Sequence, residues 1–124
     1  MIQRLDEVML YVNDQETAKA FWTEKLGFTV SSDTEQHGMR TIVLRPSSDA
    51  QTGIVLHNKQ KIQSLDLGIS TETPSLMFAT EDIEQLYQDY QNKGITVGDL
   101  VDMPQGKVFN FADDENNYFA VKQI

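Results

Sequence analysis

The sequence predicts an α+β fold made of two tandem β-α-β-β-β modules, each with a four-stranded mixed sheet and a helix on one face. A segment with the pattern of a strand, a short break and a helix occurs twice, at residues 5–28 (LDEVMLYVNDQETAKAFWTEKLGF) and at residues 75–97 (SLMFATEDIEQLYQDYQNKGITV). Runs typical of strands follow each copy and are separated by turn-forming residues. A solenoid needs at least three stacked repeats, so two copies indicate a duplicated supersecondary unit.

The first copy opens with a strand that is apolar on one face. Val8, Leu10 and Val12 alternate with more polar residues, which is the period of a half-buried strand. Asp14 then breaks the pattern and can cap a helix, because its side-chain oxygen accepts a hydrogen bond from a free backbone N–H of the first turn. Apolar residues follow at helical spacing: Ala18, Phe21, Trp22 and Leu26. Gly27 ends the helix, as a residue free to take a positive φ does.

The second copy repeats these features with a helix one residue shorter. Asp82 corresponds to Asp14 at an offset of 68 residues, whereas Gly94 corresponds to Gly27 at an offset of 67. Its apolar helical face is formed by Leu86, Tyr87 and Tyr90.

The remaining strands are expected at residues 29–32, 39–45 and 53–57 in the first module, and at 96–103, 107–111 and 117–123 in the second. Polar turns are expected at residues 33–38 and 104–106. The connector contains several apolar residues, more than a free linker needs, which favours a short helix or a packed segment. We therefore predict one domain over residues 1–124, built of a module at 1–58, a connector at 59–74 and a module at 75–124.

Composition limits the classes of function. The net charge of −9 and the pI near 4.5 disfavour binding to nucleic acid or to an anionic membrane. The absence of cysteine excludes thiolate nucleophiles, disulfides and Cys-ligated metals. No P-loop, G-x-G-x-x-G or G-x-S-x-G motif is present. The chain lacks a signal-peptide pattern and a membrane-spanning run, so we expect a cytoplasmic protein.

Residue parity divides the strands between two faces. One face is apolar and is expected to pack under the helices: Val8, Leu10, Val12, Ile54, Leu56, Leu76, Phe78, Phe119 and Val121. The opposite faces mix polar, aromatic and small residues, as the lining of a ligand-binding cleft does. The predicted lining consists of Glu7, Met9, Tyr11, Val55, His57, Ser75, Met77, Tyr118 and Ala120.

Across its whole length the chain resembles the vicinal oxygen chelate superfamily, which includes glyoxalase I, the bleomycin resistance proteins, the fosfomycin resistance transferases and the extradiol dioxygenases. The resemblance lies in the tandem modules, in FWTEKLGF of the first helix and in FADDENNYFAV near the end. Family members commonly have F-Y-x-x-x-L-G-F and D-P-x-G-N-x-x-E at these places. The resemblance implies two sheets curved around a cleft, and a homodimer.

Enzymes of this family commonly carry His, Gln or Glu metal ligands at four strand positions. By the resemblance, these positions fall on Glu7, Val55, Ser75 and Ala120. Val55 and Ala120 have no donor atom in their side chains, whereas a catalytic metal site needs about three protein ligands. We therefore expect no metal and no cofactor at these positions. The alternative is a divalent metal held at a different site by Glu7 and His57.

Three hypotheses of function follow. The first is a metal-independent protein of the bleomycin resistance type, which binds a small cationic or aromatic molecule in a cleft at a dimer interface. The second is a lyase or isomerase of the glyoxalase type with an atypical site, in which Glu7 acts as a general base or binds a metal together with His57. The third is a non-catalytic scaffold or regulatory domain. The structural alternatives are that Glu7 bonds across the cleft and that His57 is hydrogen-bonded at a strand end.

Overall fold

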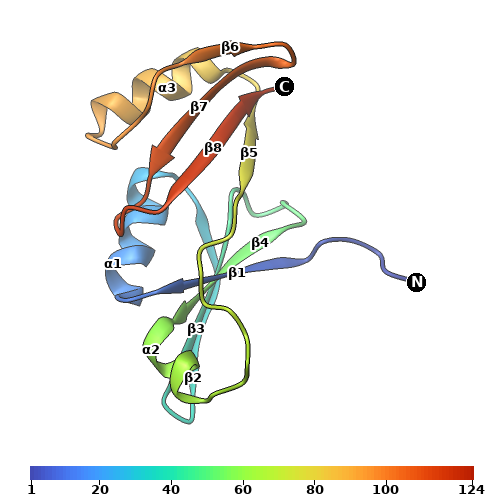
Figure 1. The fold of residues 1–124 in the computed structure, drawn as a ribbon, viewed down its shortest axis with the longest axis vertical. Coiled ribbons are helices and arrows are strands. Elements are labelled where there is room, and N and C mark those ends of the chain that lie inside the picture. Colours follow the sequence, from blue (N-terminus) through green and yellow to red (C-terminus); the bar gives the residue numbers. More distant parts are fainter. The chain divides into compact units, whose positions relative to one another are not determined.

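A computed structural model describes residues 1–124 and divides the chain into two compact units, Met1–Thr73 and Pro74–Ile124 (Figure 1). The first unit contains β1 (Glu7–Val12), α1 (Gln15–Ala20), the π-helical turn η1 (Phe21–Lys25), β2 (Thr29–Gln36), β3 (Met39–Arg45), β4 (Gly53–Asn58) and α2 (Lys59–Ser64). The second contains β5 (Met77–Thr80), α3 (Ile83–Asn92), β6 (Val101–Met103), β7 (Gly106–Ala112) and β8 (Tyr118–Gln123). No helix is long and apolar enough to cross a membrane.

Each unit has one four-stranded mixed sheet, with the orders β1-β4-β3-β2 and β5-β8-β7-β6. The first and last strands of each unit pair in parallel, and the other pairs are antiparallel. This arrangement confirms the predicted fold class. The short helix α2 lies in the segment predicted to connect the two modules.

The observed strands differ from the expected ones at three places. The turn expected at 33–38 narrows to His37 and Gly38, whose φ values of 55° and 77° are those of a tight hairpin. Consequently β2 extends to Gln36. The strand expected at 96–103 was too long: β6 covers only its last three residues, and Val97 makes an isolated bridge to Phe111. β5 begins at Met77, so Leu76 lies outside it.

Apolar side chains from the helix-facing parity positions form the core of each unit. In the first unit, Leu10, Val12 and Leu56 are fully buried with Trp22, whose ring meets Phe28 edge-on at a centroid distance of 5.0 Å. In the second unit, the core is an aromatic cluster: Tyr90, Phe109, Phe111 and Phe119. Aromatic pairs of this geometry add stabilisation beyond the area that they bury.

Both long helices begin with the predicted aspartate caps. Asp14 accepts a hydrogen bond from the Thr17 N–H at 3.0 Å, and Asp82 accepts one from the Gln85 N–H at 3.2 Å. The first helix then widens, because the Leu26 N–H donates to the carbonyl of Phe21 five residues earlier. α3 has no such turn. The extra residue of the first copy is therefore accommodated as a π-helical turn.

The last turn is held by a buried carboxylate. Asp113 is 5 % exposed and accepts hydrogen bonds from the backbone N–H groups of Glu115 and Asn117, both at 2.9 Å. The Asn117 side chain donates to the other oxygen at 3.1 Å. These bonds fix the connection from β7 to β8, and they give the asparagine of the family-like motif a structural role.

Ion pairs attach the β2–β3 hairpin to α1. Arg40 donates to both carboxylate oxygens of Asp33 at 2.8 and 2.7 Å and to Glu16 at 2.6 Å. Lys19 also donates to Asp33, at 2.7 Å. The hydrogen bonds from Arg40 and then Lys19 hold the pKa of Asp33 well below its usual range. No residue of β2 is buried, so packing contributes little to holding this strand. The ion-pair network links it to the helix.

The substitution Asp33→Asn should lower the free energy of unfolding at pH 7 by about 1 kcal/mol, the value typical of charge-assisted bonds to a partly exposed carboxylate. The folded-state pKa lies below the unfolded-state value near 3.9. The stabilisation is therefore complete above about pH 5 and is lost as the pH falls below about 4. Urea unfolding at pH 7 and pH 3 measures this, with Glu35→Gln on the same strand as the control. An equal difference at both pH values would contradict the assignment.

Candidate functional site

The strand register gathers four predicted site residues on one face of the first sheet. In the parallel β1–β4 pair, Met9 lies opposite Val55 and Tyr11 lies opposite His57. Glu7 is two residues before Met9 and shares its face, because side chains alternate along a strand. Glu7, Met9, Tyr11 and His57 therefore form one group on the face that the helix leaves free.

His57 is the centre of this group. Its Nε2 atom lies 3.3 Å from the Sδ atom of Met9, and its ring stacks on Tyr11 with a centroid distance of 5.8 Å and an interplanar angle of 23°. Burial lowers the pKa of His57, and the negative charge of Glu7 opposes this shift without cancelling it. The imidazole is thus mostly neutral at pH 7 and can donate or accept a hydrogen bond.

Val55, which was predicted to line an open cleft, is buried on this face, and Arg45 also lies on it. Val55 is 2 % exposed, so its side chain is packed within the face and is not an open lining residue. Its neighbour Val43 is also buried. Arg45, two residues beyond Val43, shares this face and donates to the Ser31 hydroxyl at 2.7 Å.

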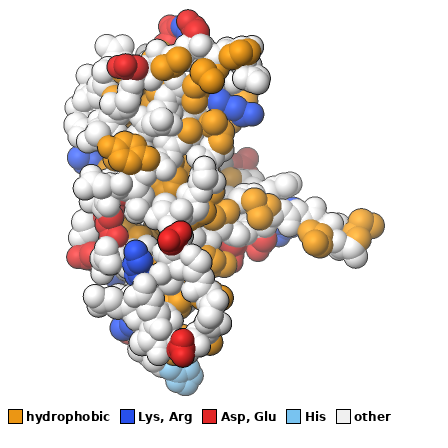
Figure 2. Space-filling view, in the orientation of Figure 1, with side chains coloured by type: hydrophobic (Ala, Val, Ile, Leu, Met, Phe, Trp, Pro, Cys, Tyr) orange, Lys and Arg blue, Asp and Glu red, His pale blue; other side chains and the backbone are white.

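The free face of the second sheet is mainly apolar. Met77 lies opposite Ala120, which in turn lies opposite Asn110. One row along, Lys122 lies opposite Val108. Figure 2 shows hydrophobic side chains gathered, with a positively charged side chain among them, where Figure 1 places β5 to β8.

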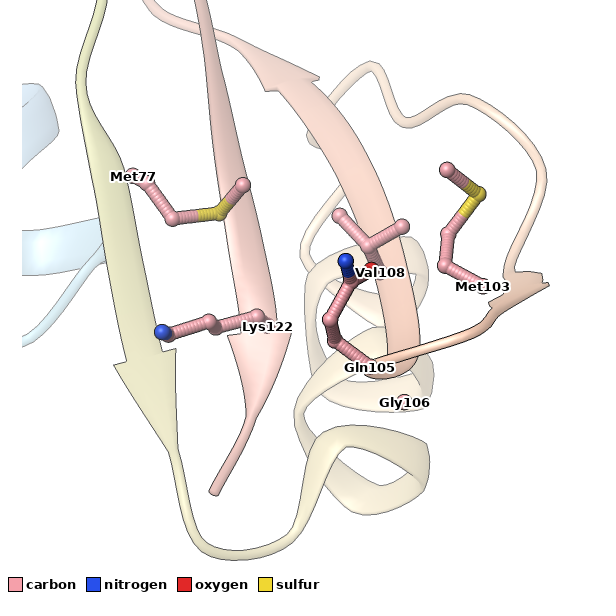
Figure 3. Close-up of a pocket in the computed structure, with 6 residues that line it drawn as sticks. All are labelled: Met77, Met103, Gln105, Gly106, Val108 and Lys122. Carbon is pink, nitrogen blue, oxygen red and sulfur yellow. The ribbon is translucent and has the colours of Figure 1, made fainter.

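A pocket of about 260 Å³ lies on this face (Figure 3). Its lining consists of Met77, Met103, Gln105, Gly106, Val108 and Lys122. Figure 3 shows these residues reaching from β5, β6, β7, β8 and the β6–β7 turn over one surface of the sheet. A shallower hollow of about 500 Å³ shares Met77, Met103 and Val108 and continues over Asp99 and Asn110. Together the two hollows form an apolar surface with a cationic end and an acidic end.

The predicted lining residues of the second unit lie on or beside this face. Met77 and Tyr118 are 56 % and 60 % exposed. Ala120 is half-buried in the centre of the sheet, and it lines the shallower hollow. Ser75 is exposed but precedes β5, so the strand register does not place it.

The lining predicted from the sequence left out Gln105, Val108 and Lys122, although Lys122 lies two residues beyond Ala120 on β8 and therefore shares its face. β7 reads GKVFNFA, which is apolar on both faces at its centre, so alternation could not assign Val108. Gln105 belongs to the turn between β6 and β7, and a turn has no parity from which to predict the direction of a side chain. Met103 is the last residue of β6 and pairs with Gly106.

The donor atoms at the family's usual metal positions do not fit a metal site. Within the first unit these positions hold one carboxylate, Glu7, and the buried Val55. Within the second they hold the hydroxyl of Ser75 and the methyl group of Ala120. No group of three or more His, Cys, Asp or Glu side chains is arranged to hold a metal ion.

A model of the Glyoxalase/Bleomycin resistance protein/Dioxygenase superfamily matches residues 4–121. The chain belongs to this superfamily. The predicted resemblance is therefore confirmed. Among the relatives of this superfamily member, the uncharacterized protein YetH of Bacillus subtilis (strain 168) is 30 % identical over 99 % of this chain and 100 % of its own length.

Solved structures of similar chains have the same fold. TnmS3, an antibiotic binding protein from Streptomyces sp. CB03234, matches with a TM-score of 0.83 and 25 % identity over 98 % of this chain and 96 % of its own. UcmS2 matches with a TM-score of 0.82 and 28 % identity over the full length of both chains.

Replacing Glu7 with glutamine should lower the pKa of His57 further, because the negative charge that raises it is removed while the burial remains. An NMR titration of the two histidine rings against pH measures the change. His37, exposed in the β2–β3 turn, provides the internal control. An unchanged titration of His57 would mean that Glu7 does not act on it.

Proposed function

We propose that this superfamily member binds a small aromatic molecule on the free face of its second sheet, without a metal ion, and that a second copy of the chain closes the site. The observation that carries this proposal is the pocket lined by Met77, Met103, Val108 and Lys122. Drug-sized ligand sites usually enclose about 300–1,000 Å³. The pocket is at the lower limit, which favours a ligand only partly covered by this sheet.

The lining favours a planar, polarizable ligand. Thioether groups such as those of Met77 and Met103 adapt their shape and make favourable contacts with aromatic rings. The branched side chain of Val108 adds a rigid apolar contact between them. An aliphatic ligand would gain the burial but not the sulfur–ring contacts.

Charged and polar groups at the rim suit a ligand with a polar edge. Lys122 and the amide of Gln105 supply donors at one end, where a carbonyl, phenol or carboxylate group would bind. Asp99 lies at the other end and suits a positively charged group. An aromatic ligand, cationic at one side, satisfies both ends.

The comparison with TnmS3 supports this assignment. TnmS3 is described as an antibiotic binding protein and is 25 % identical over nearly the whole chain. The lack of donor atoms at the family's usual metal-ligand positions agrees with a binding role. We infer that an aromatic antibiotic or a similar natural product is the class of ligand to test first.

Binding should raise the melting temperature, because a ligand that binds only the folded state stabilises it by mass action. A panel of aromatic antibiotics with cationic, neutral and anionic members is screened by thermal shift, and hits are titrated by calorimetry. Met103→Asp should weaken a hit at least tenfold by placing a charge in the apolar lining. Lys93→Gln, at the exposed end of α3, should change it less than twofold. Equal affinities of wild type and Met103→Asp would contradict the site.

Closure by a second copy predicts a dimer that depends on this face. Four exposed apolar side chains cover it: Met77, Val101, Met103 and Tyr118. Sedimentation velocity at micromolar concentration should give a dimer, and Tyr118→Glu should weaken it at least tenfold. Leu65→Glu, similarly exposed in the segment after α2, is the matched control and should leave the dimer intact. A wild-type monomer at about 100 µM, roughly a hundred times a Kd of about 1 µM, would overturn the proposed closure.

A lyase or isomerase site at Glu7 and His57 is the second candidate, because the charge of Glu7 acts on His57. Metal analysis of untagged protein separates the two functions. Near-stoichiometric nickel, zinc or manganese that is lost in Glu7→Ala would favour the enzyme. No metal and no ligand in the panel would favour the scaffold hypothesis.

A further inference from the structure

We infer that Met9 and His57 form a binding site for a soft monovalent metal ion, Cu(I), at the edge of the first sheet. This site uses neither the family's usual metal positions nor the pocket of the second sheet. It does not rest on the proposed ligand-binding function. The argument rests on the short distance between the two donors, on their chemistry and on their surroundings.

The donors are close enough to bind one ion. With metal–nitrogen and metal–sulfur distances of about 2.0 and 2.3 Å, as found for first-row metals, the 3.3 Å between Nε2 of His57 and Sδ of Met9 gives an angle at the metal of about 100°. This angle suits a three- or four-coordinate ion that also binds water or another small donor. Small side-chain rotations would open it further.

The identity of the donors selects the metal. A thioether is an uncharged soft ligand that binds Cu(I) and binds Mg²⁺ or Ca²⁺ poorly, and imidazole suits copper as well. No third His, Cys, Asp or Glu side chain completes a cluster there. A divalent zinc site would need about four ligands, so the pair favours the monovalent ion, which accepts fewer.

The surroundings favour a bound cation. β1 is an edge strand, and Met9 is 38 % exposed, so an ion reaches the sulfur from solvent. The stacked ring of Tyr11 orients the imidazole. The buried Val55 opposite Met9 gives an apolar base. Glu7 on the same face adds a negative charge that attracts a cation.

Binding needs one tautomer of His57. The Nε2 lone pair must face the metal, so the ring proton must lie on Nδ1. Without metal, Nε2–H can instead donate to the Met9 sulfur, which accounts for the short contact. The ion therefore replaces one hydrogen bond and releases no proton from a neutral ring.

The test uses protein labelled with ¹³C on its five methionine methyl groups. Ag(I) serves as the probe because it shares the soft d¹⁰ character of Cu(I) and is stable in air. We expect the Met9 methyl and the His57 ring signals to shift together and to saturate at one equivalent. Competition with bicinchoninate under anaerobic conditions then gives the Cu(I) affinity.

Met9→Leu removes the sulfur at nearly constant volume and should weaken Cu(I) at least tenfold. His57→Gln should do the same. Met103→Leu, a methionine of similar exposure in the other unit, should change the affinity less than twofold. Circular dichroism of each variant confirms that the fold is kept. Equal shifts of all exposed methionines, no shift at Met9, or an unchanged affinity in Met9→Leu would overturn the site.

Discussion

The parallel pairing of the first and last strands in each unit is the constraint on which both free faces depend. Parallel neighbours need a crossover connection, and here each crossover carries a helix to one side of its sheet. The other side is not covered by the helix. A slip of one residue in β1 would exchange the two faces and separate Met9 from His57. Leu10 and Val12 are apolar and buried, and the slip would bring both side chains into water. This cost disfavours the slipped register.

The same register gives equivalent positions different chemistry in the two units. Met9 and Met77 occupy matching places on β1 and β5. One row along, the last strand carries His57 in the first unit and Lys122 in the second. A neutral imidazole beside a thioether suits a soft metal ion, whereas an ammonium beside apolar groups suits an acceptor on an organic ligand. The two units thus share one scaffold and differ in chemistry at a few facing positions.

Much of the fold and part of the candidate site could be predicted from the sequence, because they depend on local patterns. Alternation placed Leu10 and Val12 in the core, and a short polar side chain with a glycine marked each long helix. Val55 was assigned to an open lining, although parity gives only the face and says nothing of the packing on it. Val108 was missed because β7 is apolar on both faces. The contact between Met9 and His57 depends on a pairing of strands 48 residues apart, which no local pattern contains.

The π-helical turn η1 records how the two copies came to differ. Between Asp14 and Gly27 the chain has one residue more than between Asp82 and Gly94, yet both glycines take nearly the same φ, 79° and 75°. The widened turn absorbs the additional residue before the helix ends. The chain therefore leaves the helix with the same backbone conformation in both copies, although β2 begins two residues after Gly27 and β6 begins seven residues after Gly94. In evolutionary terms, a one-residue difference in helix length has been absorbed inside the helix and has left its terminus unchanged.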